Sequence, residues 1–126
     1  KTRNIDYYVP VVKMWKDIYY KQKWKTETNE TKLLSLIILV HLISAISINT
    51  SVKATKGKTY NFKPSINRIE LGQKASIIST LHEIGHAIYG YSELDACAFS
   101  IALFKKVFPT EFKNLEWQGH MLVNKK

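Results

Sequence analysis

Two histidines and a glutamate that could bind and use a metal ion lie within five residues, in the segment His82-Glu83-Ile84-Gly85-His86. On an α-helix, residues four positions apart share one face, so both imidazoles can reach a single Zn²⁺ ion. Glu83 lies next to the first histidine, where its carboxylate can act as general base on a water molecule bound to the metal. The spacing therefore predicts a zinc site with His82 and His86 as ligands and Glu83 as the catalytic residue.

The surrounding residues predict the helix that this motif needs. Gly85 lowers helix propensity, and its place beside the ligands is explained if another backbone approaches closely there. The alternative is an ordinary helix whose histidines are only hydrogen-bonded. This alternative is less favoured, because the motif rarely arises by chance in a chain with four histidines. Apolar residues at helical spacing form a stripe that leaves the histidines on another side: Ile77, Ile78, Leu81, Ile84 and Ile88.

A catalytic zinc ion has three protein ligands and an open position for water, so one further ligand is needed. Glu93 and Asp95 are the nearest candidates in sequence, at the start of a helix that follows Gly90. A tight turn at Gly90 can fold this second helix back against the helix of the motif. On the residues alone, either carboxylate can be the ligand, and either can instead remain near the helix N-terminus, where negative charge is favourable. The one that does not bind metal could orient a ligating histidine, and Cys97 is expected to be a small buried side chain.

The segment STLHEIGHAIYGYSELDACAFSIALF, residues 79 to 104, resembles the core of ImmA/IrrE-type zinc metallopeptidases, a gluzincin-like family. There, an H-E-[IL]-G-H-x-[IL] helix is followed by a helix of the form E-x-[DE]-A-x-x-F-A, whose first seven positions correspond to residues 93 to 99 of this chain. The resemblance implies that His82, His86 and Glu93 bind zinc, that Glu83 activates water, and that a sheet precedes the motif.

This sequence departs from the family pattern in two places, and the first 58 residues are not covered by the resemblance. Only six residues separate His86 from Glu93, fewer than in many relatives. Cys97 stands where relatives often have Asn or Asp. These departures bear on the third ligand more than on the histidine pair.

A chain of 126 residues is enough for one hydrophobic core. We expect a single zincin-like domain of the α+β class, mainly helical, with helices in residues 1–58 and a small antiparallel sheet and the active-site helices in residues 59–107. Helices are predicted over residues 9–25, 33–48, 75–89 and 93–107, strands over 59–62 and 67–71, and a short helix and tail after residue 110. Thr28 or Asn29 is expected to cap the second helix, and Gly90 to end the third. Ser92 is expected to cap the fourth helix, and Pro109 to end it. In the helix over 93–107, the expected apolar side consists of Leu94, Ala98, Ile101, Ala102 and Phe104.

The formal net charge is +9, yet all nineteen Lys and Arg residues lie outside residues 75–104. A segment without basic residues suits a divalent cation. The lysines elsewhere could attract nucleic acid or an acidic protein, but scattered lysines with almost no arginine favour an ordinary solvated surface. Nucleic acid is therefore less favoured as a partner than the protein or peptide substrate that the H-E-x-x-H motif predicts.

Residues 33–48 form an uncharged run of sixteen residues, which is shorter than the about twenty apolar residues of a membrane span and includes His41 and three serines. A buried core helix with His41 as a core histidine is expected there, rather than a membrane segment. No targeting segment is recognised, and the single cysteine excludes an intramolecular disulfide. These features favour a cytoplasmic protein.

Together the patterns predict a zinc-dependent metallopeptidase that hydrolyses peptide bonds, with a regulatory protein as one candidate substrate. Two alternatives remain at this point: a basic nucleic-acid- or protein-binding module with a zincin-like fold and little or no turnover, and a peptidase tethered to a membrane through residues 33–48. The reaction also needs a group that stabilises the oxyanion. The candidates for this role are Tyr60, Tyr89, Tyr91 and His120.

Overall fold

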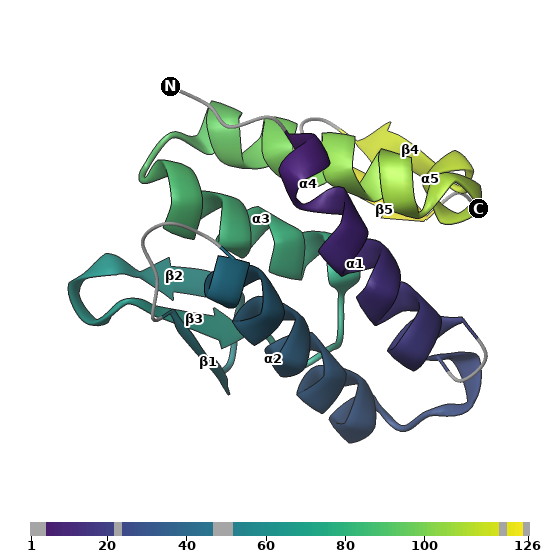
Figure 1. The fold of residues 1–126 in the computed structure, drawn as a ribbon, viewed down its shortest axis with the longest axis horizontal. Coiled ribbons are helices and arrows are strands. Elements are labelled where there is room, and N and C mark those ends of the chain that lie inside the picture. The colour runs from purple at the N-terminus through teal and green to yellow at the C-terminus, as the bar shows by residue number, and fades with distance from the viewer. Residues whose placement is uncertain (1–4, 22–23, 47–51, 119–120, 125–126) are drawn as a thin grey trace.

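Helices packed on one another and on a small mixed sheet make up the chain (Figure 1), which confirms the predicted, mainly helical α+β class. The computed structural model describes residues 5–21, 24–46, 52–118 and 121–124. The main elements are α1 (Val9–Trp15), α2 (Asn29–Ile46), β1 (Lys53–Lys56), β2 (Asn61–Lys63), β3 (Arg68–Leu71), α3 (Ile77–Tyr89), α4 (Glu93–Val107), α5 (Pro109–Lys113), β4 (Leu115–Gln118) and β5 (Met121–Asn124), with short helical turns at Ile5–Tyr7, Lys16–Tyr20, Trp24–Thr26 and Pro64–Ile66.

The sheet beside α3 has three strands in the order β1-β3-β2. β2 and β3 pair antiparallel, as the sequence predicts, but β1 runs parallel to β3. The prediction of a purely antiparallel sheet preceded by helices is therefore wrong for residues 53–56. This strand buries only Ala54, so its conformation depends on pairing with β3 rather than on an apolar pattern of its own.

The first predicted helix, over residues 9–25, is shorter than expected. α1 ends at Trp15 and continues as one π-helical turn, Lys16–Tyr20; residues 22–23 lie outside the described part of the chain. Val12 and Trp15 are fully buried, and the indole N–H of Trp15 donates a hydrogen bond to the carbonyl oxygen of Ser35 in α2 (2.7 Å). This contact joins α1 to α2 above the core.

α2 begins after Thr28, whose hydroxyl oxygen accepts a hydrogen bond from the backbone N–H of Thr31 (3.2 Å), as expected for its cap. Its predicted end at residue 48 lies outside the described residues. One side of the helix belongs to the core, whereas Leu34 on another side is 59% exposed. The core side consists of Leu33, Leu36, Leu39, Val40 and Ile43.

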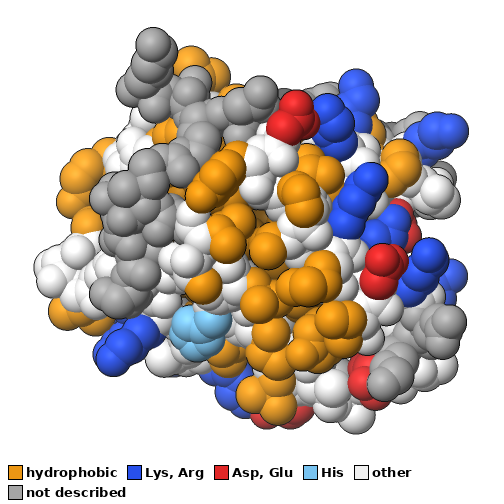
Figure 2. Space-filling view, viewed as in Figure 1, with side chains coloured by type: hydrophobic (Ala, Val, Ile, Leu, Met, Phe, Trp, Pro, Cys, Tyr) orange, Lys and Arg blue, Asp and Glu red, His pale blue; other side chains and the backbone are white. Residues whose placement is uncertain are grey.

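His41 is exposed, so the prediction of a core histidine is wrong. α2 is apolar nearly all round, and such a sequence does not reveal which side faces the core. Figure 2 shows hydrophobic side chains exposed across the face formed by α1 and α2. By length and apolar composition alone, α2 would also suit a membrane span, a test that the core helices of many soluble proteins pass as well.

α3 and α4 lie side by side (Figure 1), and their buried sides complete the core. In α4 the predicted apolar side is wrong for Leu94, which is 79% exposed, and for Ala98, which is also exposed. α4 has apolar residues on most of its surface, so the packing of α3 and α1 selects the buried side. That side consists of Ala96, Phe99, Leu103, Phe104 and Val107.

The C-terminal part was only partly predictable. α4 ends before Pro109, as expected, and Pro109 begins the short helix α5. The predicted tail instead contains an antiparallel pair, β4 and β5. The residues between these strands, 119–120, lie outside the described part of the chain.

Candidate metal centre

Both histidines of the motif lie on a side of α3 that is turned away from its core contacts. Ser76 caps this helix, since its Oγ accepts a hydrogen bond from the backbone N–H of Ser79 (3.2 Å). The side chains of His82 and His86 are 21% and 16% exposed and lie one turn apart on the same face, as their spacing predicts. The opposite, buried side of α3 includes Ile77, Leu81 and Ile84.

A turn at Gly90 brings α4 back beside α3. Gly90 has φ 84° and ψ −144°, backbone angles that residues with a Cβ atom rarely adopt. Ser92 then caps α4, with its Oγ accepting a hydrogen bond from the backbone N–H of Asp95 (3.1 Å). Both features agree with the sequence prediction. They place Glu93 in the first turn of α4, next to the histidines.

His82, His86 and Glu93 converge on one point. Nε2 of His82 lies 3.0 Å from Oε2 of Glu93, and Nε2 of His86 lies 3.0 Å from Oε1 of the same carboxylate. The ligand atoms of these three residues all lie within 4.8 Å of one another, so the group could hold a metal ion. Ligands about 2.1 Å from a tetrahedral ion lie about 3.4 Å apart, somewhat more than the two nitrogen–oxygen distances of 3.0 Å. Two imidazoles with one carboxylate are a donor set of catalytic zinc sites.

The hydrogen-bond partners of His86 favour a positive charge between its ring and the Glu93 carboxylate. Its Nδ1 lies 2.8 Å from the carbonyl oxygen of Gly90, while its Nε2 faces Glu93. Both neighbours only accept hydrogen bonds, and a neutral imidazole has a single N–H. Two arrangements therefore satisfy both ring nitrogens. In one, the ring is an imidazolium that donates to both acceptors. In the other, a neutral ring donates to the Gly90 carbonyl, and a cation lies between Nε2 and the Glu93 carboxylate.

His82 favours the neutral form. Burial lowers the pKa of its imidazole, although the negative charge of Glu93 acts in the opposite direction. A neutral ring has a nitrogen lone pair that can bind a metal ion. The other ring nitrogen, Nδ1, lies 3.7 Å from Sγ of Cys97.

Glu83 is buried beside the histidines and is 8% exposed. Burial raises the pKa of its carboxyl group, an effect that the charge of Glu93 increases and that of His86 opposes. Within the described residues, no donor hydrogen-bonds to this carboxylate. A raised pKa makes a carboxylate a stronger base, which suits a group that takes up and returns a proton.

The three residues and Glu83 border a cleft of about 450 Å³. One wall comes from β2 and the residues around it, another from α3, and a third from the turn into α4. No Lys or Arg is among the described residues of these walls, in agreement with the basic-free segment of the sequence. The cleft is lined by Tyr60, Asn61, Phe62, Pro64, His82, Glu83, His86, Gly90, Tyr91 and Glu93.

Asp95, the alternative third ligand, is not part of this group of donors. Its backbone N–H takes part in the Ser92 cap, and its position two residues after Glu93 turns its side chain to a different side of α4. The structure therefore brings Glu93, and not Asp95, to the two histidines.

The candidates for oxyanion stabilisation differ in their surroundings. The hydroxyl of Tyr60 donates to the carbonyl oxygen of Lys74 (2.9 Å) and accepts from the backbone N–H of Ser76 (2.9 Å), so it supports the start of α3. Tyr91 is 85% exposed and lines the cleft. The ring of Tyr89 packs edge-on against that of Phe99.

Sequence reasoning missed part of the cleft and one contact of the centre. His120, the remaining oxyanion candidate, lies outside the described residues. Asn61, Phe62 and Pro64 form cleft wall, for which the only sequence signal was a strand ahead of the motif. The approach of Cys97 to His82 had no signal beyond its place one turn after Glu93.

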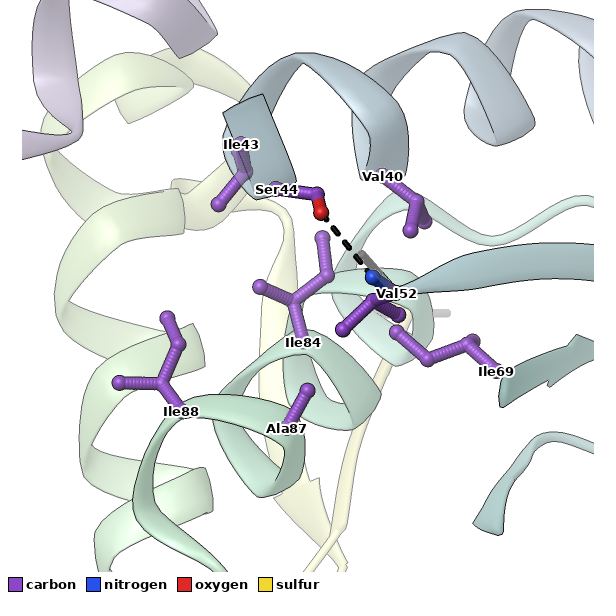
Figure 3. Close-up of a pocket in the computed structure, with 8 residues that line it drawn as sticks. All are labelled: Val40, Ile43, Ser44, Val52, Ile69, Ile84, Ala87 and Ile88. Carbon is purple, nitrogen blue, oxygen red and sulfur yellow. Dashed lines mark hydrogen bonds between the residues drawn. The ribbon is translucent and has the colours of Figure 1, made fainter. Parts of the chain in front are cut away.

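A second hollow, on the other side of α3, has a different character (Figure 3). It measures about 10 Å³, room for about one water molecule, and its walls are almost entirely apolar. Among the described residues that line it, Ser44 is the polar one, and its hydroxyl accepts a hydrogen bond from the backbone N–H of Val52 (3.1 Å). We interpret it as a packing gap between α2, the sheet and α3.

Comparison of the chain with family models, with curated proteins and with solved structures finds no match. Functional inference for this protein therefore rests on its own residues and their arrangement.

Proposed function

We propose that this chain is a zinc-dependent metallopeptidase in which His82, His86 and Glu93 bind the metal ion and Glu83 is the general base. One observation carries the proposal: two imidazole nitrogens and a carboxylate converge beside a cleft, with a second, buried carboxylate adjacent. We also propose, on the motif pattern of residues 79–104 alone, that this part of the chain is of the ImmA/IrrE metallopeptidase type.

A bound Zn²⁺ ion would supply Lewis acidity toward a water molecule and toward the substrate carbonyl. Glu83 accepts the proton of the attacking water and later delivers it to the leaving amine, a double role that suits its raised pKa. The carbonyl of Gly90 holds the ring of His86 in the tautomer that leaves Nε2 free. Tyr91 lies at the cleft and can donate a hydrogen bond to the oxyanion that forms on the substrate.

The cleft suits an extended polypeptide. β2 is an edge strand among the described strands, because the order β1-β3-β2 gives it a partner on one side only. Asn61 and Phe62 of this strand line the cleft, so a substrate that pairs with the open edge of β2 would pass beside Glu83 and the histidines. This geometry favours a protein or peptide substrate over nucleic acid, since the described residues of the walls include no basic side chain.

The test combines metal analysis with cleavage of an unfolded protein such as casein. The purified chain is expected to hold one zinc ion and to cleave casein, and Glu83→Gln is expected to keep the metal while its hydrolysis rate falls by orders of magnitude. Glu27→Gln, which changes a carboxylate far from the motif in sequence and outside the cleft, is the matched control and should retain activity. An active Glu83→Gln chain would exclude the mechanism, and a zinc-loaded chain that cleaves no peptide would favour a binding module.

A further inference from the structure

Each imidazole of the centre has a partner on the nitrogen that faces away from Glu93. Nδ1 of His86 meets the carbonyl oxygen of Gly90 at 2.8 Å, and Nδ1 of His82 meets Sγ of Cys97 at 3.7 Å. Partners of this kind fix the tautomer and orientation of a metal-binding histidine, and their loss commonly weakens metal binding. Carboxylates and backbone carbonyls usually play this part, whereas a thiol at this position is unusual.

We infer that Cys97 is a positioning residue whose sulfur accepts a hydrogen bond from Nδ1–H of His82 and thereby turns the Nε2 lone pair of that ring toward the metal position. The inference rests on the proposed metal centre, but not on peptide hydrolysis.

The placement of Cys97 on α4 explains how one helix holds both sides of the ring. Glu93 and Cys97 are four residues apart and so lie on the same face of α4. Glu93 contacts Nε2 of His82 and Cys97 contacts its Nδ1, which fixes the rotation of the imidazole from both ends. The close packing of α4 on α3, where a Cβ on Gly85 would come within 3.0 Å of the Cα of Ala96, brings the sulfur within reach.

The thiol also sets how strongly the ring is polarised. A thiol sulfur is only a weak hydrogen-bond acceptor. A carboxylate in the same place would accept the Nδ1 proton more strongly and make the ring a better ligand. The centre is thus expected to hold its metal less tightly than it would with an acidic partner.

Three variants of the full chain separate positioning from packing. Cys97→Ala removes both the acceptor and its volume, Cys97→Val removes the acceptor while keeping bulk, and Cys97→Asp replaces the sulfur with a stronger acceptor. The first measurement is Zn²⁺ affinity by competition with a chromophoric chelator. We expect a loss of about 10- to 100-fold for Ala and for Val, and wild-type or tighter binding for Asp.

The second measurement follows the ring itself. In the zinc-loaded chain, exchange of the Nδ1–H proton with solvent is measured by NMR for both histidines. The His82 proton should exchange faster in the Ala and Val variants and slowly in wild type and the Asp variant, while the His86 proton, held by Gly90, should not change and serves as an internal control. Thermal unfolding of the metal-free variants shows whether a substitution lowers the stability of the fold itself, independently of the metal.

Cys97→Val with wild-type zinc affinity and unchanged His82 exchange would overturn the inference, as would a wild-type chain that binds no zinc. Neither measurement involves a substrate. A chain that shows the expected losses and yet cleaves no peptide would therefore reject the proposed peptidase activity and retain the role of Cys97.

Discussion

Gly85 of α3 faces Ala96 of α4 so closely that a side chain on Gly85 would be in tight contact with the backbone of α4. A Cβ atom there would lie 3.0 Å from the Cα and 3.1 Å from the carbonyl oxygen of Ala96. Both are backbone atoms, which cannot rotate away as the end of a side chain can. This approach sets the distance between the two helices three residues after Glu93 and therefore positions the Glu93 carboxylate against the histidines.

The first prediction tests this approach with Gly85→Ala. The added methyl group should push α4 away from α3 at a cost of about 1–3 kcal/mol, from which about 1 kcal/mol of improved helix propensity is recovered. Zinc affinity should fall because Glu93 moves with α4. Denaturant unfolding of the metal-free chain and zinc titration measure the two effects, and a variant that is more stable than wild type with unchanged zinc affinity would show that the contact is not restrictive.

The second prediction compares Glu93→Ala with Asp95→Ala. Glu93 contacts Nε2 of both histidines, so its loss should weaken zinc binding about as much as His82→Ala or His86→Ala. Asp95 contacts neither histidine among the described residues, and its loss should change zinc affinity by less than about tenfold, the lower end for a supporting residue. Chelator competition on the four variants gives the order, and a larger loss for Asp95→Ala would move the third ligand to that residue.

The residues that the sequence predicted best are those whose structure is set by their neighbours along the chain. Ser92 caps α4 and Gly90 ends α3, as predicted, because helix caps and positive φ angles depend on local chemistry. The helix α3 was also predicted, although its cap, Ser76, was not. The strand at residues 53–56 was missed because pairing with β3 creates it, and the buried side of α4 was misassigned because Leu94 and Ala98 look like core residues in the sequence.

In the metal centre, too, some features follow from the local sequence and others depend on the packing of the fold. The facing of His82 and His86 follows from helical periodicity alone, and so does their proximity to Glu83. The choice of Glu93 over Asp95 depends on how closely α4 approaches α3, which only the fold determines through Gly85 and Ala96. The contact between Cys97 and His82 depends on the same approach.

The third prediction concerns the pH dependence of stability through Glu83. Its pKa is raised in the folded chain, so the folded state binds this proton more tightly than the unfolded state. The resulting stability is fully present below the unfolded pKa of about 4.3 and is lost as the pH rises through the raised value. Metal-free Glu83→Gln should therefore be more stable than wild type at pH 7, with a difference that shrinks toward pH 4. Denaturant unfolding across this pH range checks the sign, and a variant that is less stable at pH 7 would contradict it.

The fourth prediction separates two tyrosines of the cleft. Tyr91→Phe should lower kcat by about 100- to 1000-fold if its hydroxyl stabilises the oxyanion, with little effect on unfolding because the side chain is exposed. Tyr60→Phe should instead lower the free energy of unfolding by about 1–3 kcal/mol, because the N–H of Ser76 loses its partner. Kinetics and denaturant unfolding of both variants test the assignment, and full activity in Tyr91→Phe would exclude that residue.

The fifth prediction uses Gly90→Ala to isolate the backbone of the turn. A Cβ on Gly90 would meet no atom within 4 Å, so any effect must come from its φ of 84° rather than from a clash. Holding alanine at these angles costs about 1–3 kcal/mol, and relaxing them rotates the carbonyl that accepts from Nδ1 of His86. Both stability and zinc affinity should fall. Asn67→Ala is the matched control, since Asn67 also has a positive φ, 52°, but lies outside the cleft lining: it should lose stability and keep its zinc affinity. Equal zinc affinities for the two variants would show that the Gly90 carbonyl does not support the centre.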